Sequence, residues 1–533
     1  MIKAKIKRIV EKEYKNICRK QKGWKIKNLK PEILQPTVKK FGDYSCNIAF
    51  LIAQARKKNP GQIAVFFKKC LEKNKDAQKL FAKIEIAGSG FLNFYLKKEF
   101  LQDELKKALK KGKDFGKINL GKGKKIQVEF ISANPTGPLT IGNARGGPFG
   151  DSLANVLKFA NYKVEKAYYV NDCGKQIVEL GKSLLGKGGK YQGEYIKEIK
   201  KKIKTKDPYQ AGQKGARIIL EEIIKPVVEK LGIKYDEWFF ESMLYESGRL
   251  EETINLLIKK GLTYTKEGAL WFKSKKFGDV RDRVLVKKDG TKTYLAGDIA
   301  FHRYKFEEKK FDKVINIWGA DHHGDVAGLQ AGVSALGHKG KLDIILLQFV
   351  TILQDGRPVR MSKREGKFIT MEELLNEVGR DVVRFFFLER SADKHLEFDL
   401  NLAREQSEKN PVYYIQYAYA RICSILRKYR RVKNLKPRSK ELRLLTSPQE
   451  ITLIKEILRF PEIVEEISQN YQVQRLPKYS LELASAFHQF YHNCQVLTKD
   501  DSLTKARISL IIATKNVLKN LFELMGISAP QKM

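Results

Sequence analysis

Cysteine is scarce in this chain of 533 residues, and its six cysteines lie far apart. They stand at Cys18, Cys46, Cys70, Cys173, Cys423 and Cys494, and no two of them form a Cys-x-x-Cys pair. The sequence therefore argues against a structural zinc site and against a disulfide framework. A reducing, cytoplasmic location is the simplest expectation.

Long apolar runs are missing as well. No stretch approaches the ~18 uninterrupted apolar residues of a membrane-spanning helix. The first twenty residues mix lysines with acids and have no long apolar centre, so they do not resemble a signal peptide. We expect no membrane partner.

Acidic residues are few relative to basic ones, with 61 Asp and Glu against 103 Lys and Arg, a net charge of +42. This balance suits a polyanionic partner such as nucleic acid. Most of the cations are lysines, however, and a lysine-rich proteome would give much of the same charge without a partner. Charge alone therefore leaves nucleic-acid binding open.

Enough apolar residues remain, at 42%, for several packed cores, and the length suggests about three or four domains. Residues 1–115 mix an amphipathic helix at the start with a strand-like segment at Gly90–Leu96, a pattern typical of an α+β domain. Lys106–Lys125 holds nine lysines and one acid, which indicates a solvated linker.

Residues 116–403 alternate strand-like and helix-like segments, so we expect an α/β region with a Rossmann-type parallel sheet. Its strands are predicted at Ile126–Phe130, Val314–Trp318 and Asp343–Val350, and an insertion is predicted at about 183–293. Residues 404–533 show helical periodicity with few turn residues, which predicts an all-α helical bundle.

Two loops of the α/β region carry residues suited to chemistry. In the first, residues 128–147, a strand ends in a Pro/Gly-rich loop and a helix begins. Backbone N–H groups at such a helix start can hold phosphate, although similar loops often serve only as turns. The second, Gly356–Gly366, carries Arg360, Lys363 and Arg364 before a helix that opens with a Thr370/Glu373 capping box. Three cations alone would equally suit an ordinary surface loop.

Taken together, the two loops resemble the HIGH and KMSK elements of class I aminoacyl-tRNA synthetases. The chain as a whole resembles arginyl-tRNA synthetases, and the resemblance covers nearly its full length. The matching stretches are Glu129–Gly147, Tyr168–Gln176, Trp318–Gly324, Met361–Asp399, Asn410–Leu426 and the ending Gly526–Met533.

The resemblance implies an N-terminal tRNA-elbow-binding domain (1–115), a class I catalytic domain (116–403) and an anticodon-binding domain (404–533). It implies an arginine–tRNA ligase, which activates L-arginine with ATP to arginyl-adenylate, transfers it to the 3′ end of tRNA(Arg) and releases AMP and diphosphate. ATP with Mg²⁺ would be a substrate, and no tightly bound cofactor is expected. The partners would be tRNA(Arg), ATP and L-arginine, and we expect a monomer.

For catalysis, the resemblance points to Lys363 as the group that stabilises the leaving pyrophosphate, supported by Arg360, Met361 and Ser362. Both HIGH histidines are replaced, because the element is Thr140-Ile141-Gly142-Asn143. Thr140 and Asn143 can still hydrogen-bond but cannot be cationic. The residues implied for ATP binding are Pro138, Thr140, Gly142, Asn143 and Lys363.

For arginine, Tyr294 and Asp298 are four residues apart and would share a helix face, and a carboxylate can pair with a guanidinium in two parallel hydrogen bonds. An ordinary surface helix pair would have the same spacing. The residues implied for arginine binding are Glu129, Ser132, Asn134, Asn143, Tyr294, Asp298 and His322. Asp321, His322 and His323 lack further nearby ligands, so no metal site is predicted.

For tRNA, the resemblance suggests Phe91 and Asn93 in the first domain, and Tyr413, Gln416, Tyr417 and Arg421 in the last. Single-stranded bases are usually read by stacking and edge contacts. Two alternatives stay open at this point: a synthetase-like RNA-binding protein that has lost catalysis, which the missing HIGH histidines suggest, and a synthetase for another amino acid.

Overall fold

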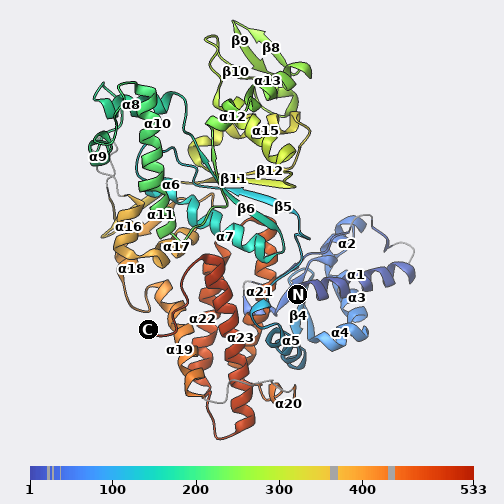
Figure 1. Ribbon diagram of the computed structural model, residues 1–533. Helices are drawn as coiled ribbons and strands as arrows, with labels where there is room; N and C mark the ends of the chain where they lie inside the picture. The colour runs from blue at the N-terminus through green and yellow to red at the C-terminus, as the bar shows by residue number, and fades with distance from the viewer. Residues whose placement is uncertain (21–23, 27–28, 37, 360–369, 430–438) are drawn as a thin grey trace.

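The computed structural model describes residues 1–20, 24–26, 29–36, 38–359, 370–429 and 439–533, and Figure 1 shows their arrangement. A central sheet lies between an upper part, which holds the insertions, and a lower helical bundle, and the N-terminal domain lies beside that bundle. Among these residues, no helix is long and apolar enough to cross a membrane.

The N-terminal domain is α+β, as the sequence predicts. Its four-stranded antiparallel sheet has the order β1-β2-β4-β3. The strands are β1 (Ile33–Leu34), β2 (Tyr44–Cys46), β3 (Phe81–Ala87) and β4 (Phe91–Leu96), and the helices are α1 (Ile2–Lys20), α2 (Ile48–Arg56), α3 (Pro60–Glu72), α4 (Lys75–Leu80) and α5 (Lys98–Lys111).

The predicted linker at Lys106–Lys125 is wrong over its first part. Helix α5 continues to Lys111, and its residues Leu101, Leu105 and Ala108 are buried at helical spacing. The lysines lie on the opposite, solvated face. Charge density alone therefore hid an amphipathic helix.

The α/β region is built on a five-stranded parallel sheet with the order β12-β11-β5-β6-β7, which confirms the α/β prediction. Its strands are β5 (Lys125–Glu129), β6 (Lys163–Val170), β7 (Glu237–Phe240), β11 (Lys313–Gly319) and β12 (Leu342–Leu347). The chain leaves the neighbouring strands β5 and β11 toward opposite edges of the sheet. Ligands of such sheets bind at the carboxyl ends of the strands at this switch point.

Helices cover the sheet and frame this switch point. Those nearest to it are α6 (Ile141–Ala144), α7 (Gly146–Phe159), α12 (Ser242–Glu246), α14 (Tyr294–Arg303) and α15 (His323–Ala335). The stretch 183–293, predicted as one insertion, is divided by β7, which belongs to the main sheet. Around β7 lie α8 (Lys175–Leu185), α9 (Glu194–Lys200), α10 (Pro208–Ile218), α11 (Lys225–Lys230), α13 (Arg249–Lys259) and an antiparallel sheet of β8 (Thr263–Lys266), β9 (Ala269–Phe272) and β10 (Arg283–Val286).

The single strand predicted at Asp343–Val350 is two strands. Strand β12 ends at Leu347, and β13 (Val350–Gln354) begins a second sheet of order β14-β13-β15. The chain turns between them, where the Gln348 amide donates to the Ala392 carbonyl at 2.9 Å. The remaining elements of this subdomain are β14 (Arg357–Pro358), β15 (Leu396–Asp399), α16 (Met371–Val378), α17 (Arg380–Leu388) and α18 (Leu400–Arg404).

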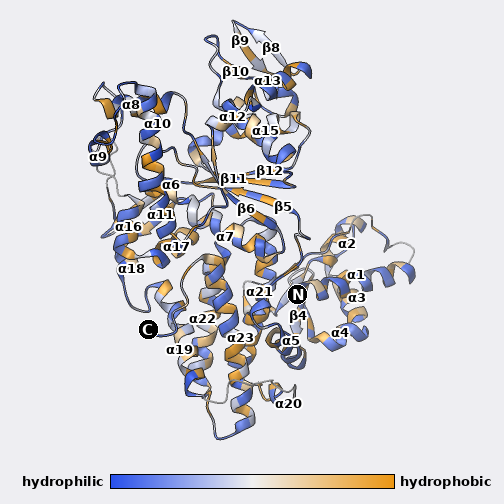
Figure 2. Cartoon of the chain, viewed as in Figure 1, coloured by the Kyte–Doolittle hydropathy of each residue, from blue (hydrophilic) through white to orange (hydrophobic). Residues whose placement is uncertain are grey.

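The C-terminal region is a helical bundle, as predicted. It consists of α19 (Pro411–Lys428), α20 (Ser439–Leu442), α21 (Pro448–Asn470), α22 (Arg475–Asn493) and α23 (Asp501–Met525). Figure 2 shows these helices with alternating apolar and polar stripes, which is the pattern of helices that bury one face. At the start of α21, Ser447 and Glu450 form a capping box.

The bundle is docked on both other domains. Glu462 of α21 accepts from the Lys3 amide at 2.6 Å and from the Tyr44 hydroxyl at 2.9 Å, which fastens the N-terminal domain to it. On the catalytic side, the fully buried Arg384 donates to the Met525 carbonyl at 2.6 Å and to Asp151 of α7 at 2.6 Å.

Candidate active site

The loop after β5 carries unusual backbone at the switch point. Ile131 and Ser132 have φ angles of 64° and 43°, in the left-handed region that non-glycine residues avoid. Such strain concentrates at functional sites because the surroundings must hold it in place. Here the Ser132 hydroxyl accepts from the Tyr169 amide at 3.1 Å, which ties the loop to β6.

Tyrosine side chains fix the rest of this loop. Their hydroxyls donate to its backbone carbonyls: Tyr168 to Ala133 at 2.8 Å, Tyr195 to Thr136 at 2.9 Å and Tyr235 to Phe130 at 2.9 Å. The Asn134 amide donates to Gln176 at 2.8 Å. The loop is therefore preorganised by side chains from four different segments.

Thr140 and Asn143 hold each other at the start of α6. Thr140 is the N-cap residue, and its hydroxyl accepts from the Asn143 amide at 3.3 Å. The same hydroxyl donates to Asn143 Oδ1 at 2.6 Å, so the side-chain NH₂ of Asn143 faces other partners. Asn143 and Gly142 are exposed, and the space beside Gly142 is open apart from a 4.0 Å approach to Thr140. This helix start is therefore accessible to an anionic ligand.

The chain that follows the second basic loop lies beside the first loop. Arg360, Met361, Ser362 and Lys363, together with Arg364, lie outside the described residues. The chain re-enters the described part at Thr370, which forms a β-bridge with Thr140, and the Met371 amide donates to the Leu139 carbonyl at 2.9 Å. Helix α16 follows with the predicted Thr370/Glu373 capping box, which is confirmed.

Asp298 lies one helical turn after Tyr294 on α14, as their spacing predicts. Burial, followed by the charges of Glu129 and Glu241, raises the pKa of Asp298 to about 8. Tyr294 stands at the helix start and is 64% exposed, at the mouth of the site. The carboxyl group is thus poorly ionised while it lacks a cationic partner.

Glu241 is a functional candidate that sequence reasoning missed. It directly follows β7, is buried, and its Oε2 has no hydrogen-bond partner in the part of the chain that the structure describes. Burial raises its pKa to about 7. The signal available in the sequence was its position right after a strand of the parallel sheet, but β7 itself was not predicted.

Glu129, by contrast, already has a cation. Its Oε2 lies 2.5 Å from Nζ of Lys305, which is fully buried. Among the described residues, the two acidic groups Asp298 and Glu241 therefore have no neutralising partner at this site. Such a pair of acids favours a ligand that carries a delocalised positive charge.

The backbone of α14 is fixed beside the sheet by a buried histidine. His302 Nδ1 lies 2.7 Å from the Asp298 carbonyl, and its Nε2 lies 3.0 Å from Nδ2 of Asn316 on β11. If Asn316 donates, His302 is neutral with its proton on Nδ1, and burial lowers its pKa well below the usual value. The chain therefore holds Asp298 at a set distance from the end of β11.

His322 lies at the other side of the crevice, just after β11. Its ring nitrogens lie 3.8 Å from Asp321 and 3.6 Å from Asp325, and the side chain is exposed. Among the described residues, no group of three or more histidine, cysteine or acidic side chains is arranged to hold a metal ion.

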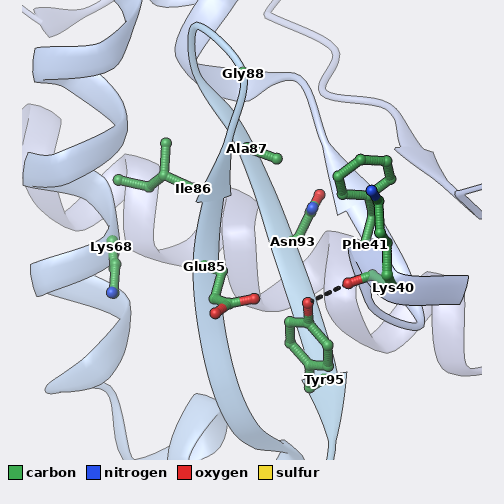
Figure 3. A pocket seen from close by; sticks show the side chains of 9 residues that line it. All are labelled: Lys40, Phe41, Lys68, Glu85, Ile86, Ala87, Gly88, Asn93 and Tyr95. Atoms are coloured by element: carbon green, nitrogen blue, oxygen red, sulfur yellow. Dashed lines mark hydrogen bonds between the residues drawn. The ribbon is translucent and has the colours of Figure 1, made fainter. Parts of the chain in front are cut away.

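The N-terminal domain has a polar cavity of about 500 Å³ on its sheet. Figure 3 shows Asn93, Glu85 and Tyr95 projecting from the two paired strands toward Lys40 and Phe41, and the Tyr95 hydroxyl donates to the Lys40 carbonyl at 2.8 Å. Asn93 lines this cavity. Phe91 does not line it; that ring is 38% exposed and packs on Phe50 at 4.7 Å.

The predicted residues of the last domain separate into two groups. Tyr413 and Tyr417 stack in parallel at 6.2 Å, and the Arg421 guanidinium lies over the rings of Tyr417 and Tyr491. This group, Tyr413, Tyr417, Arg421 and Tyr491, is called the aromatic face below. Gln416 points the other way, because its amide donates to Asp381 at 2.9 Å and to Ser528 at 3.1 Å.

Comparisons with known proteins agree with this architecture. The chain matches family models described as the arginyl tRNA synthetase N-terminal domain (residues 2–96), the catalytic domain of tRNA synthetases class I (R) (104–194 and 191–408) and the DALR anticodon binding domain (415–533). The arginine–tRNA ligase of Caldanaerobacter subterraneus subsp. tengcongensis is 43% identical, covering 94% of this chain and 93% of the relative. That of Moorella thermoacetica is 44% identical, covering 93% of each.

Solved structures are similar as well. A putative arginyl-tRNA synthetase from Campylobacter jejuni matches with a TM-score of 0.74 at 34% identity, over 82% of this chain and 100% of the other. The Thermus thermophilus arginyl-tRNA synthetase matches with a TM-score of 0.77 over 100% of both chains, and its 22% identity supports the fold alone.

Proposed function

The chain belongs to the arginyl-tRNA synthetase family, and on that premise we propose how its residues divide the work of charging tRNA(Arg). The chain activates arginine with ATP and transfers it to tRNA(Arg), as an arginine–tRNA ligase does. The observation that carries the assignment of the site is the pair of under-ionised carboxyls, Asp298 and Glu241, beside the switch point of the sheet.

Arginine binds with its guanidinium between Asp298 and Glu241. The incoming cation favours ionised carboxylates, so it lowers the pKa of both groups and offsets the penalty of their burial. Glu129 contributes less free charge than the sequence suggests, because Lys305 neutralises it. Ser132, Asn134, Asn143, Tyr294 and His322 surround the remainder of the amino acid.

ATP binds along the start of α6, where the Gly142 backbone N–H and the Asn143 side-chain NH₂ can donate to it, while Pro138 and Thr140 shape the same turn. Lys363, with Arg360, Met361 and Ser362, is assigned to the β- and γ-phosphates; these four residues lie outside the described part of the chain, which resumes at Thr370 beside Thr140. Mg²⁺ enters with ATP as part of the substrate. The arginine carboxylate attacks the α-phosphorus, and the bond to pyrophosphate breaks.

In the second step, a hydroxyl of the terminal ribose of tRNA attacks the arginyl carbonyl carbon, and AMP leaves. Both steps depend on positioning and on charge stabilisation rather than on a protein nucleophile. The replaced HIGH histidines fit this scheme. Thr140 orients the Asn143 side chain, and the Asn143 NH₂ supplies a donor at the same helix start.

tRNA(Arg) lies along the domains that we assign to residues 1–115, 116–403 and 404–533. The cavity around Asn93 takes a nucleotide of the elbow, with Lys40 and Lys68 near its phosphate and Phe91 beside it. The aromatic face takes anticodon bases, which stack on its rings. Gln416 is not part of this proposal, since its amide is used inside the protein. We further propose a cytoplasmic monomer, which size-exclusion chromatography with light scattering tests.

The deciding experiment is ATP–pyrophosphate exchange with each of the twenty amino acids, with and without total tRNA. Exchange with arginine alone supports the assignment, and stimulation by tRNA adds that the RNA helps to assemble the site. If no amino acid supports exchange while tRNA still binds, the chain is an RNA-binding relative that has lost catalysis. Exchange with a different amino acid would refute the arginine pocket.

A further inference from the structure

Arg145 is a buried cation without an acidic partner. It lies two residues after Asn143, where α6 ends and α7 begins, and its side chain is 2% exposed. Among the described residues, no carboxylate is within ion-pair distance of it. Its guanidinium donates to three backbone carbonyls instead: those of Gln348, Ser391 (3.1 Å) and Lys394 (3.1 Å).

A cation in this setting is unfavourable for the fold by itself. Burial lowers the pKa of Arg145 to about 10, and the charge of Asp393 offsets this only in part. Buried charges are normally paired with an opposite charge, because carbonyl dipoles replace only part of the lost hydration. The cost of burying Arg145 indicates that its contacts hold separate parts of the structure together.

The three carbonyls belong to one structural unit. Gln348 lies between β12 and β13, while Ser391 and Lys394 lie between α17 and β15. The strands β13 and β15 pair in parallel from Val350 and Leu396 onward, and the Leu396 amide donates to the Phe349 carbonyl at 3.0 Å. Arg145 thus closes the end of the sheet formed by β13, β14 and β15.

That sheet leads directly into the second basic loop. Strand β14 ends at Pro358, and residues 360–369 follow it. After them the chain returns at Thr370, beside Thr140. On its own side, Arg145 continues the helical turn that begins with Thr140. The guanidinium therefore spans the helix start that offers donors to ATP and the subdomain that carries Lys363.

We propose that Arg145 is a positioning residue for adenylate formation. This inference rests on the proposed function and extends it. Arg145 fixes the position of the Thr140–Asn143 turn, where we place ATP, relative to the sheet of β13, β14 and β15. Arginine suits the task because its planar fork serves several carbonyls at once, whereas lysine presents a single ammonium group.

The test uses the full chain and its Arg145→Lys and Arg145→Met variants, each assayed well below its own unfolding temperature. ATP–pyrophosphate exchange is measured with tRNA present, and the ATP and arginine dependences are separated. A displacement of about 1 Å at reacting groups can slow a reaction roughly 100-fold. We expect a kcat loss of that order with a raised KM for ATP, and a much smaller change in the KM for arginine, because its guanidinium is held by Asp298 of α14 and by Glu241 after β7.

Arg384→Lys is the matched control. Arg384 is equally buried and also donates to carbonyls, but those belong to Leu231 and Met525, and its acid partner is Asp151. This control should lower the unfolding temperature without the selective loss of kcat. As a second readout, guanidinium ion at sub-denaturing concentration should partly restore exchange to Arg145→Ala, because it refills the space between the three carbonyls.

Each result decides the matter. A kcat loss with normal tRNA binding and normal KM for arginine supports the positioning role. Three results overturn it, because Arg145 would then be dispensable or merely structural. These are exchange close to the wild type, a loss shared equally by the KM for arginine, and a variant that unfolds or loses tRNA binding together with activity. A wild-type chain without arginine-dependent exchange would instead refute the proposed function.

Discussion

Replacing Asp298 with asparagine removes one negative charge from the arginine pocket at nearly constant shape. Breaking a buried ion pair costs about 3–5 kcal/mol. In the wild type, part of the free energy of this ion pair is offset, because a carboxyl with a pKa of about 8 must first lose its proton at pH 7. That step costs about 1.4 kcal/mol, since one pKa unit corresponds to about that free energy.

The difference leaves about 1.6–3.6 kcal/mol of binding free energy that Asp298→Asn should lose. This corresponds to an arginine affinity roughly 14- to 370-fold weaker, at about 1.4 kcal/mol per factor of ten. Isothermal titration calorimetry with arginine gives the affinity directly, and the KM for arginine in the exchange assay gives a second estimate. Asp289→Asn, which changes an exposed acid in the turn before α14, serves as the control and should bind as the wild type does.

The pH dependence makes the test stricter. Because the pKa of Asp298 is raised, the empty site holds a proton at neutral pH, and arginine binding must release it. Wild-type affinity should therefore rise as the pH increases from 6 to about 9, by up to roughly tenfold above its value at pH 7 for this one group. Asp298→Asn should lack this part of the rise. An affinity within about threefold of the wild type, or a flat wild-type profile over this range, would refute the reasoning.

Three further predictions concern other parts of the molecule. Glu241→Gln should reduce proton release on arginine binding, measured by calorimetry in buffers of different ionisation enthalpy; an unchanged release would place Glu241 outside the pocket. In the wild type, the pKa values of Glu241 and Asp298 are raised in the empty fold, so the free energy of unfolding falls as the pH rises from the pKa values of the unfolded chain toward about 7 and 8. The increase in unfolding temperature caused by arginine should therefore be larger at pH 8.5 than at pH 6. Tyr417→Ala should weaken tRNA binding by roughly 5- to 150-fold, as expected for a lost stacking contact of about 1–3 kcal/mol, while the exposed Lys519→Ala serves as the control; equal binding by both variants would exclude the aromatic face.

Local patterns in the sequence predicted the local parts of the site. The strand, loop and helix around Thr140 follow from a short stretch of sequence, and the four-residue spacing of Tyr294 and Asp298 indicates a shared helix face. The capping box at Thr370 is equally local. In each case the interacting residues are close in the chain, so that periodicity and turn chemistry are sufficient evidence.

The remaining features depend on tertiary contacts. Glu241 joins the pocket only because β7 pairs with β6, and Lys305 neutralises Glu129 from a distant helix turn. Gln416 sits in the same helical turn as Tyr413 and Tyr417, yet its side chain points toward Asp381 of α17 and toward Ser528, which follows α23. The roles proposed for Lys363 and its neighbours fall on residues outside the described part of the chain and stay predictions.

The contacts of Glu462 have a consequence for how the protein can distinguish tRNAs of different length. Because Lys3 and Tyr44 fasten the first domain to α21 of the last domain, the cavity around Asn93 and the aromatic face are joined in one rigid unit. The distance between these two surfaces is set by protein packing and not by the RNA. A tRNA whose elbow-to-anticodon distance is changed by one inserted base pair would contact only one of the two surfaces at a time. The protein would then select tRNAs by their length before it reads any base.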